Sequence, residues 1–226
     1  MFERKEHSVN YLESHDGYTL GDFIRIATRE ADPNIIIRDV DDHIKLTPIQ
    51  LKLNKLAALF LFTSQGITMI NSGQEFAHSK VIPYKIKEND SNKGKMDQNT
   101  YNKDNETNYI NYKHAELNED LLNYYKGLIA LRKKFASFRR AEYDEIHFMD
   151  HPRSKFGVGY ILKSHGEALV VLLNADQHLS LEFKLPAGTW EVLADRNNAD
   201  SKSLYKVNDH VVLESVTGIV LRLETE

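Results

Sequence analysis

The stretch VNYLESHD, residues 9–16, joins a short strand pattern to two adjacent ionisable side chains. Val9 to Leu12 has the pattern of a buried strand, and His15 and Asp16 stand just beyond its end. In parallel α/β architectures, functional side chains gather at the carboxyl ends of strands, in loops that lead into helices. A histidine can donate hydrogen bonds to a hydroxyl group and an ionised carboxylate can accept them. His15 and Asp16 are therefore candidate site residues.

A structural alternative explains the same two residues. The segment over residues 19–30 carries apolar side chains at helical spacing, so a short helix is expected directly after the turn. Asp16 or Thr19 would then be the cap of that helix, and His15 would be a turn residue. On pattern alone this alternative is favoured.

The rest of the first half predicts a strand, helix, strand order. TPIQLKLNKLAALFLFTSQG, residues 47–66, begins with the Thr-Pro pair typical of a helix start and ends at a glycine. ITMIN, residues 67–71, suits a buried strand, and residues 117–138 form an amphipathic helix pattern. Residues 73–118 are rich in Asn, Lys and Asp with few apolar side chains, and a loop of this length is functional or disordered. We expect an α/β arrangement with a parallel sheet.

The pattern changes after residue 140. Six runs alternate or cluster apolar residues between turn signals, which is typical of an antiparallel β-sandwich; they are GVGYILK, ALVVLLNA, LSLEFKLP, TWEVLA, HVVLES and GIVLRLE. Trp190 alternates with apolar partners, which favours a core position over an exposed binding platform. We therefore predict two domains, residues 1–140 and 141–226.

Composition excludes several classes of function. The 226 residues are 41% hydrophobic and 27% charged, as in ordinary folded proteins, and the net charge is −4. Lys and Arg are scattered, so we expect no nucleic-acid partner. With no cysteine and no metal-ligand spacing among the histidines, we assign no metal-ligating residue and expect no cofactor, while metal dependence stays open. We expect His43, His78, His114 and the later histidines to be surface residues. We find neither a signal-peptide pattern nor a membrane-length apolar run; the location stays open.

Several segments resemble one known family. VNYLESHDGYTLGDF (9–23) resembles the seventh-strand segment of family 13 glycoside hydrolases, the α-amylase family, most closely its pullulanase and debranching branch. LAALFLFTSQGITMINSGQEF (56–76) resembles the helix and eighth strand that follow. NTYNKDNETNYINY (99–112) is similar, without gaps, to the family motif N-S-Y-N-A-P-D-E-I-N-x-I-D-W, and YYKGLIALRKKFASFR (124–139) resembles the helix that closes the barrel.

The resemblance implies the seventh and eighth strand/helix units of a (β/α)₈ TIM barrel, followed by a β-sandwich. It implies retaining hydrolysis of an α-glucan such as starch, glycogen or pullulan, with the linkage open between α-1,6 and α-1,4. Asp16 would be the carboxylate that stabilises the transition state, and His15 would bind hydroxyl groups of the same glucose. Asn102 and Asn105 would lie near neighbouring glucose units, although Asn105 stands where the family has Asp.

The family's nucleophile and general acid come from earlier strands, and we find no segment that resembles either motif. We therefore expect the chain to be the C-terminal portion of a longer enzyme and to be inactive by itself. One alternative is a non-catalytic glucan-binding module. Another is a structural module that associates with the missing N-terminal part of the barrel, or with a second copy, through an unpaired strand edge.

Overall fold

The computed structural model describes residues 7–28, 32, 34–84, 91–149 and 154–224, and these divide into two compact units. The described parts of residues 11–54 and 69–122 form what we call the loop-rich unit. Those of residues 1–10, 55–68 and 123–226 form the sheet-rich unit. Helices α3 (Pro48–Thr63) and α5 (Glu119–Lys134) supply residues to both. The expected domain boundary at residue 140 rests on the change in element type and stays a prediction.

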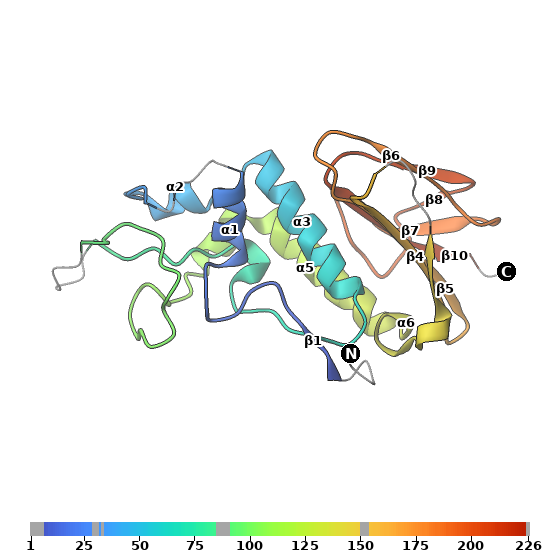
Figure 1. Cartoon of the computed structure of the whole chain (residues 1–226), viewed down its shortest axis with the longest axis horizontal. Helices are drawn as coiled ribbons and strands as arrows, with labels where there is room; N and C mark the ends of the chain where they lie inside the picture. The colour runs from blue at the N-terminus through green and yellow to red at the C-terminus, as the bar shows by residue number, and fades with distance from the viewer. Residues whose placement is uncertain (1–6, 29–31, 33, 85–90, 150–153, 225–226) are drawn as a thin grey trace. The chain divides into compact units, whose positions relative to one another are not determined.

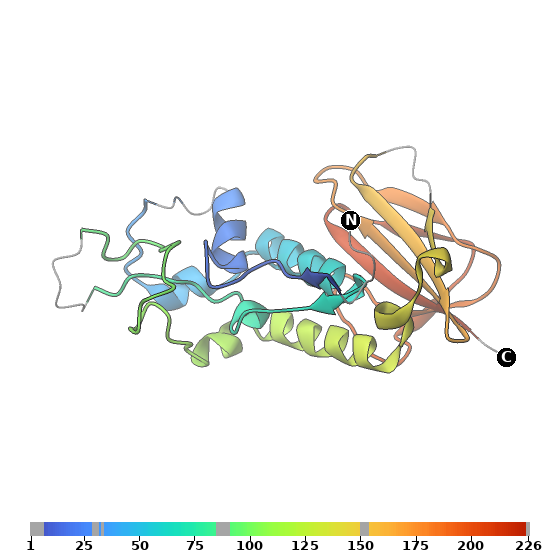
Figure 2. The same ribbon diagram turned by 60° about the horizontal axis from the view of Figure 1, so that its bottom comes forward.

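Two short strands of the sheet-rich unit pair in parallel. Strand β1 (Val9–Asn10) lies beside β2 (Ile67–Thr68), as Figure 2 shows. In this pair Val9 is opposite Ile67. The Asn10 side chain also donates a hydrogen bond to the Gln65 carbonyl oxygen at 2.5 Å, which ties the two segments together. The predicted parallel pairing is confirmed, with strands of two residues each. The prediction that these strands are buried is wrong, because Val9 and Ile67 are 50% and 51% exposed.

Antiparallel sheets make up most of the sheet-rich unit (Figure 1). A six-stranded sheet has the order β3-β4-β5-β10-β7-β8, and β6 pairs with β9 in a second sheet. The strands are β3 (Ile146–Met149), β4 (Gly157–Ser164), β5 (Glu167–Asn174), β6 (Leu181–Lys184), β7 (Trp190–Ala194), β8 (Tyr205–Val207), β9 (His210–Leu213) and β10 (Thr217–Leu223). Each of the six predicted runs contains a strand. The two strands without a prediction, β3 and β8, are the edges of the larger sheet.

Both antiparallel sheets contribute to one apolar core. It joins Phe183 from β6 and Leu213 from β9 to Leu172, Trp190 and Leu221 from the larger sheet. Trp190 is 1% exposed and its indole N–H donates to the Pro186 carbonyl oxygen at 2.9 Å. The prediction that Trp190 is a core residue is confirmed.

A buried arginine holds the segment that leads into β2. The Arg132 guanidinium, on α5, donates to the backbone carbonyl oxygens of Phe62, Ser64, Gly66 and Phe138 at 2.6 to 3.0 Å. The first three belong to the end of α3 and the turn after it, where orphan carbonyl groups need donors. Burial lowers the pKa of Arg132 to about 10, which leaves the side chain charged at neutral pH.

The loop-rich unit is built from short helices and long connections. Its complete helical elements are α1 (Leu20–Ala27), α2 (Val40–Ile44), η2 (Gln74–Phe76) and α4 (Lys113–Leu117). The buried amide of Asn118 links two of them, because it donates to the carbonyl oxygens of Ile44 at 2.9 Å and Phe76 at 3.0 Å. The described structure as a whole mixes helices with antiparallel sheets.

Candidate functional site

His15 and Asp16 lie side by side on an exposed turn. Their side chains are 71% and 74% exposed, and the His15 Nε2 lies 3.4 Å from Asp16 Oδ1. Asp16 pairs with Asn99 in an isolated antiparallel bridge. Gly17 follows with a φ of +76°, a left-handed conformation that favours glycine, and its N–H donates to the Gln98 carbonyl oxygen at 2.9 Å. Backbone contacts therefore hold the turn while both side chains remain accessible.

The capping alternative for Asp16 is wrong. Helix α1 is capped by Thr19, whose side-chain oxygen accepts from the Asp22 N–H at 3.0 Å. The same hydroxyl donates to the His78 carbonyl oxygen at 2.6 Å, so Thr19 is buried and occupied on both sides. The carboxylate of Asp16 does not cap the helix; it lies exposed beside the His15 ring.

A pocket of about 240 Å³ opens beside His15 within the loop-rich unit. Its lining comes from the His15 turn, from the segment after β2 and from the Asn-rich loop: His15, Asn71, Ser72, His78, Lys80, Thr100, Tyr101, Asn108 and Ile110. It offers a 65% exposed tyrosine ring, Tyr101, together with amide, imidazole and ammonium groups. Such a set suits a neutral ligand with many hydroxyl groups.

The structure does not bring Asn102 and Asn105 into this lining, as far as the described residues show. The Asn105 side chain accepts from the Thr107 N–H at 3.0 Å, so it stabilises a turn of its own loop. Asn102 lies exposed at the surface. Asn108 lines the pocket instead, with its amide donating to the Thr100 carbonyl oxygen at 2.6 Å. Sugar contacts of Asn102 and Asn105 stay predictions.

Lys80 holds the His15 turn through a hydrogen bond, and the sequence pattern does not predict this role. The residue is 4% exposed, and its ammonium group donates to the His15 carbonyl oxygen at 2.9 Å. Its backbone N–H donates to Asp22 Oδ2 at 3.0 Å, which fixes Lys80 to helix α1. Because Lys80 and His15 are 65 positions apart, only the folded chain brings them together.

Glu13, in the stretch VNYLESHD, is a second supporting residue that the sequence pattern does not predict. It is 3% exposed and accepts from the Leu20 N–H at 2.8 Å and from the Asn71 side chain at 2.9 Å. Burial raises its pKa from 4.5 to about 7, against the opposing effects of these two hydrogen bonds and of Lys80. Glu13 therefore links the start of α1 to a residue of the pocket lining.

A buried ion pair lies at the centre of helix α1. Asp22 and Arg25 are 0% and 1% exposed, and their side chains are 3.3 Å apart. Burial disfavours the ionised carboxyl group, but His43 and Arg25 more than compensate, so the pKa of Asp22 is lowered. Arg25 also donates to the carbonyl oxygens of Ile44 at 2.7 Å and Ala77 at 3.1 Å. The pair stabilises the helix that follows the candidate turn.

The expectation of surface histidines is confirmed for His147, His165, His178 and His210, which are exposed, and is wrong for three others. His78 and His114 are 4% and 5% exposed, and the His43 side chain is 11% exposed beside Asp22. His114 Nε2 lies 2.9 Å from the Asp41 carboxylate. Burial lowers the pKa of His78 to about 4, so its ring is neutral at neutral pH.

The described residues contain no group of three or more His, Cys, Asp or Glu side chains placed to hold a metal ion. Across the same part of the chain, none of the helices combines the length and the apolar character that a membrane span needs.

No protein-family model matches the chain. Similar proteins found by sequence and by structure include pullulanases and glycogen debranching enzymes. Pullulanase A of Streptococcus pneumoniae serotype 2 is 26% identical over 263 residues, covering 95% of this chain and 20% of the relative. A glycogen debranching enzyme of Dickeya chrysanthemi is 24% identical over 213 residues, covering 82% of this chain and 30% of the relative. The solved pullulanase of Anoxybacillus sp. LM18-11, complexed with maltotriose, is 25% identical with a TM-score of 0.73, covering 97% of this chain and 27% of that one.

The chain spans about a fifth of the length of the pullulanase relative from Streptococcus. The likeness extends over nearly all of this chain, in both sequence and fold. The resemblance inferred from the motifs is thereby confirmed: the chain is similar to pullulanases and glycogen debranching enzymes along most of its length.

Proposed function

We propose that this chain is part of an α-glucan hydrolase of the pullulanase type. Residues 1–140 would supply the seventh and eighth strand/helix units of a (β/α)₈ barrel, and residues 141–226 an antiparallel β-sandwich. The parallel pairing of β1 with β2, with helix α3 between them in the chain, supports the first part. The two antiparallel sheets with one shared core support the second.

The observation that carries the proposal is the exposed His15 and Asp16 pair on its supported turn, beside a pocket with Tyr101. Hydrolysis of a glycosidic bond passes through a transition state with positive charge on the sugar ring. The Asp16 carboxylate would stabilise that charge without covalent reaction, and the His15 ring would donate to hydroxyl groups of the same glucose.

Support for the ligand class comes from the relatives. The Anoxybacillus pullulanase is a complex with maltotriose, a short α-glucan. We therefore propose a substrate of the starch, glycogen or pullulan type, cleaved with retention. Retaining enzymes need a nucleophilic carboxylate and a general acid about 5 Å apart. In this proposal both belong to another part of the enzyme, and this chain alone binds the glucan without cleaving it.

Titration of the full chain with maltotriose tests the proposed site. We expect NMR signals of residues 13–17, 71 and 101 to shift, and the affinity to fall about tenfold in His15→Ala, which loses a hydrogen bond to the sugar. Asp16→Asn keeps the shape but not the charge and should also weaken binding. The matched control is Asp120→Asn, which neutralises an exposed carboxylate on α5 outside the pocket lining. Equal loss of affinity in Asp120→Asn, or no shifts near His15, would refute the site.

A non-catalytic glucan-binding module is the second candidate function. Both candidates predict that the chain binds maltotriose, and they differ in whether it belongs to a catalytic barrel. Adding the upstream part of the enzyme in trans should restore cleavage of pullulan under the first proposal, and Asp16→Ala should abolish that cleavage. Turnover by the isolated chain that disappears in Asp16→Ala would instead show that the reacting carboxylates lie within residues 1–226.

A further inference from the structure

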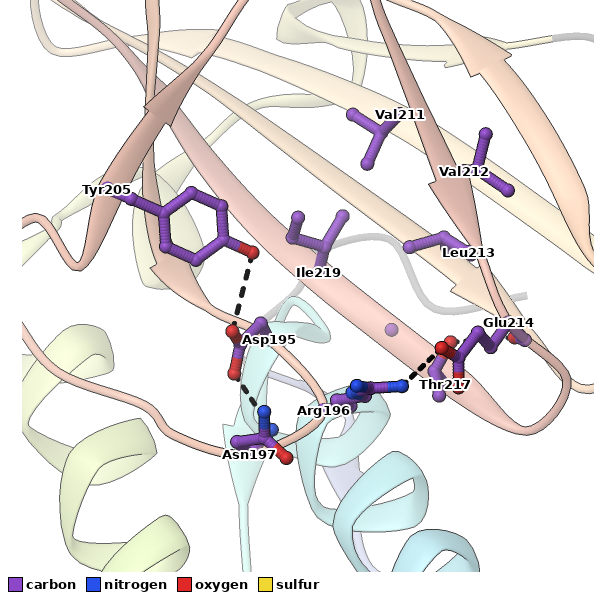
Figure 3. Close-up of a pocket in the computed structure, with 11 residues that line it drawn as sticks. Asp195, Arg196, Asn197, Tyr205, Val211, Val212, Leu213, Glu214, Thr217 and Ile219 are labelled. Carbon is purple, nitrogen blue, oxygen red and sulfur yellow. Dashed lines mark hydrogen bonds and ion pairs between the residues drawn. The ribbon is translucent and has the colours of Figure 1, made fainter.

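We propose that the sheet-rich unit carries a second binding site, which takes the end of a short α-glucan oligosaccharide. The site is a pocket of about 330 Å³ between the turn after β7, the start of β8 and the end of β9 (Figure 3). This volume lies at the low end of the roughly 300–1,000 Å³ of small-molecule sites. All of its lining belongs to the sheet-rich unit, so it is separate from the His15 pocket.

Polar side chains form two walls of this pocket. In Figure 3 the Tyr205 hydroxyl points to Asp195, and it donates to the carboxylate at 3.3 Å. On the other side an ion pair joins Arg196 to Glu214. The side chains of that pair are about half exposed, so their charged groups are accessible to the hydroxyl groups of a ligand.

The floor is apolar. Val211, Leu213 and Ile219 line the pocket, and the last two are 5% and 3% exposed members of the core. Tyr205 is 46% exposed and adds an aromatic ring at the rim. An aromatic ring and an apolar floor accept the C–H faces of a pyranose, while hydroxyl groups at its edge meet carboxylate, guanidinium and amide groups.

The walls are held in place before any ligand arrives. The Asp195 carboxylate accepts the N–H groups of Asn197 and Asn198, both at 2.8 Å, which fixes the turn after β7. On the opposite wall, the buried amide of Asn174 donates to the Glu214 carbonyl oxygen at 2.9 Å, and the Thr217 hydroxyl donates to the same oxygen at 2.7 Å. A preformed site loses less entropy on binding than a mobile one.

The charges point to a neutral ligand. Arg196 balances the charge of Glu214. The described lining therefore keeps a single net negative charge, on Asp195, whose carboxylate already accepts hydrogen bonds from Tyr205, Asn197 and Asn198. This charge disfavours an anionic ligand and leaves hydroxyl groups as suitable donors to the carboxylate. Tyr205 is the one aromatic residue among the described residues that line the pocket, so it takes the role of the platform. The choice of an α-glucan as the ligand rests on the proposed function, whereas the geometry of the pocket is independent of it.

The test is a maltotriose titration of the full, ¹⁵N-labelled chain. We expect signals of residues 195–198, 205 and 211–219 to shift together, both in the wild type and in Asp16→Asn. Tyr205→Ala should weaken this binding about tenfold, as expected for loss of an aromatic contact. The matched control is Tyr143→Ala, which removes a 94% exposed tyrosine outside the pocket.

The outcomes separate the two sites. Shifts near Tyr205 without shifts near His15 would uphold this inference and refute the first proposal. Shifts near His15 alone, or a Tyr205→Ala variant that binds like Tyr143→Ala, would overturn the second site. If Tyr205→Ala does not fold, Arg196→Ala gives the same readout, because it removes an exposed wall residue, and unchanged binding in that variant would count against the site.

Discussion

Replacing Glu13 by glutamine should remove the contribution of Glu13 to the pH dependence of the free energy of unfolding. Glu13 is 3% exposed and its pKa rises from 4.5 in the unfolded chain to about 7 in the fold because of burial. The fold therefore favours the protonated carboxyl group. The resulting loss of stability is absent below pH 4.5, grows between 4.5 and about 7, and is complete above that range.

The structure gives the magnitude. A pKa change from 4.5 to about 7, at about 1.4 kcal/mol per unit of pKa, corresponds to a cost of about 3 kcal/mol at pH 8. The amide side chain of the Glu13→Gln variant would carry no charge and escape this cost. It would, however, offer one oxygen to two donors, the Leu20 N–H and the Asn71 amide, and an unsatisfied buried donor costs about 1–3 kcal/mol at every pH. At pH 4.5 the variant should be less stable than the wild type. Between pH 4.5 and pH 8 the difference in free energy of unfolding should change by about 3 kcal/mol in favour of the variant.

Urea unfolding, followed by circular dichroism from pH 4.5 to 8.5, measures this difference. Groups that titrate equally in both proteins cancel when the two free energies of unfolding are subtracted. The change of this difference with pH therefore reports Glu13 itself. The control Glu106→Gln removes an exposed carboxylate of the same unit. A side-chain carboxyl NMR titration of the wild type should show the Glu13 midpoint near 7. A midpoint at or below 4.5, or a difference that does not change with pH, would refute the argument that burial governs this group.

Three further substitutions test other parts of the structure. Lys80→Met removes the donor to the His15 carbonyl oxygen, so maltotriose should bind about tenfold more weakly while circular dichroism stays unchanged, and Lys80→Arg should restore part of the affinity. Arg132→Met leaves four backbone oxygens without their donor and should lower the free energy of unfolding by about 3–5 kcal/mol, whereas Arg132→Lys should cost less. Gly127→Ala would place a Cβ 1.8 Å from the Ala199 carbonyl oxygen, so thermal unfolding should show a loss of stability in place of the gain of about 1 kcal/mol usual for this change within a helix.

The sequence predicts the central strands of the larger sheet well because their patterns are strong. The β5 stretch ALVVLLN is apolar almost throughout because both of its faces are buried, and five of its residues are 0% exposed. Strands β3 and β8 are edges with one neighbour each, and exposed side chains such as Phe148 and Tyr205 weaken their pattern. Burial on both faces leaves a signal in the sequence, and burial on one face leaves a weaker one.

The sequence predicts only the exposed residues of the candidate site and not the buried residues that support them. His15 and Asp16 are adjacent, so one motif reveals both. The groups that hold their turn come from distant segments: Lys80 reaches His15 across 65 positions, and Asn71 reaches Glu13 across 58. Burial of His78 depends on the same long-range packing, which explains why its expected place at the surface was wrong.

Glu13 and His78 act in opposite directions on the pH dependence of the same unit. Burial raises the pKa of Glu13 to about 7, so its contribution to stability falls as the pH rises from 4.5 to 7. Burial lowers the pKa of His78 from 6.5 to about 4, so its contribution is complete above 6.5 and is lost as the pH falls toward 4. Between pH 4.5 and 6.5 the two slopes have opposite signs and similar sizes, because both groups are buried in their neutral forms. The contributions of Glu13 and His78 should therefore largely cancel across that range, and urea unfolding of a variant that lacks one of them should reveal the slope of the other.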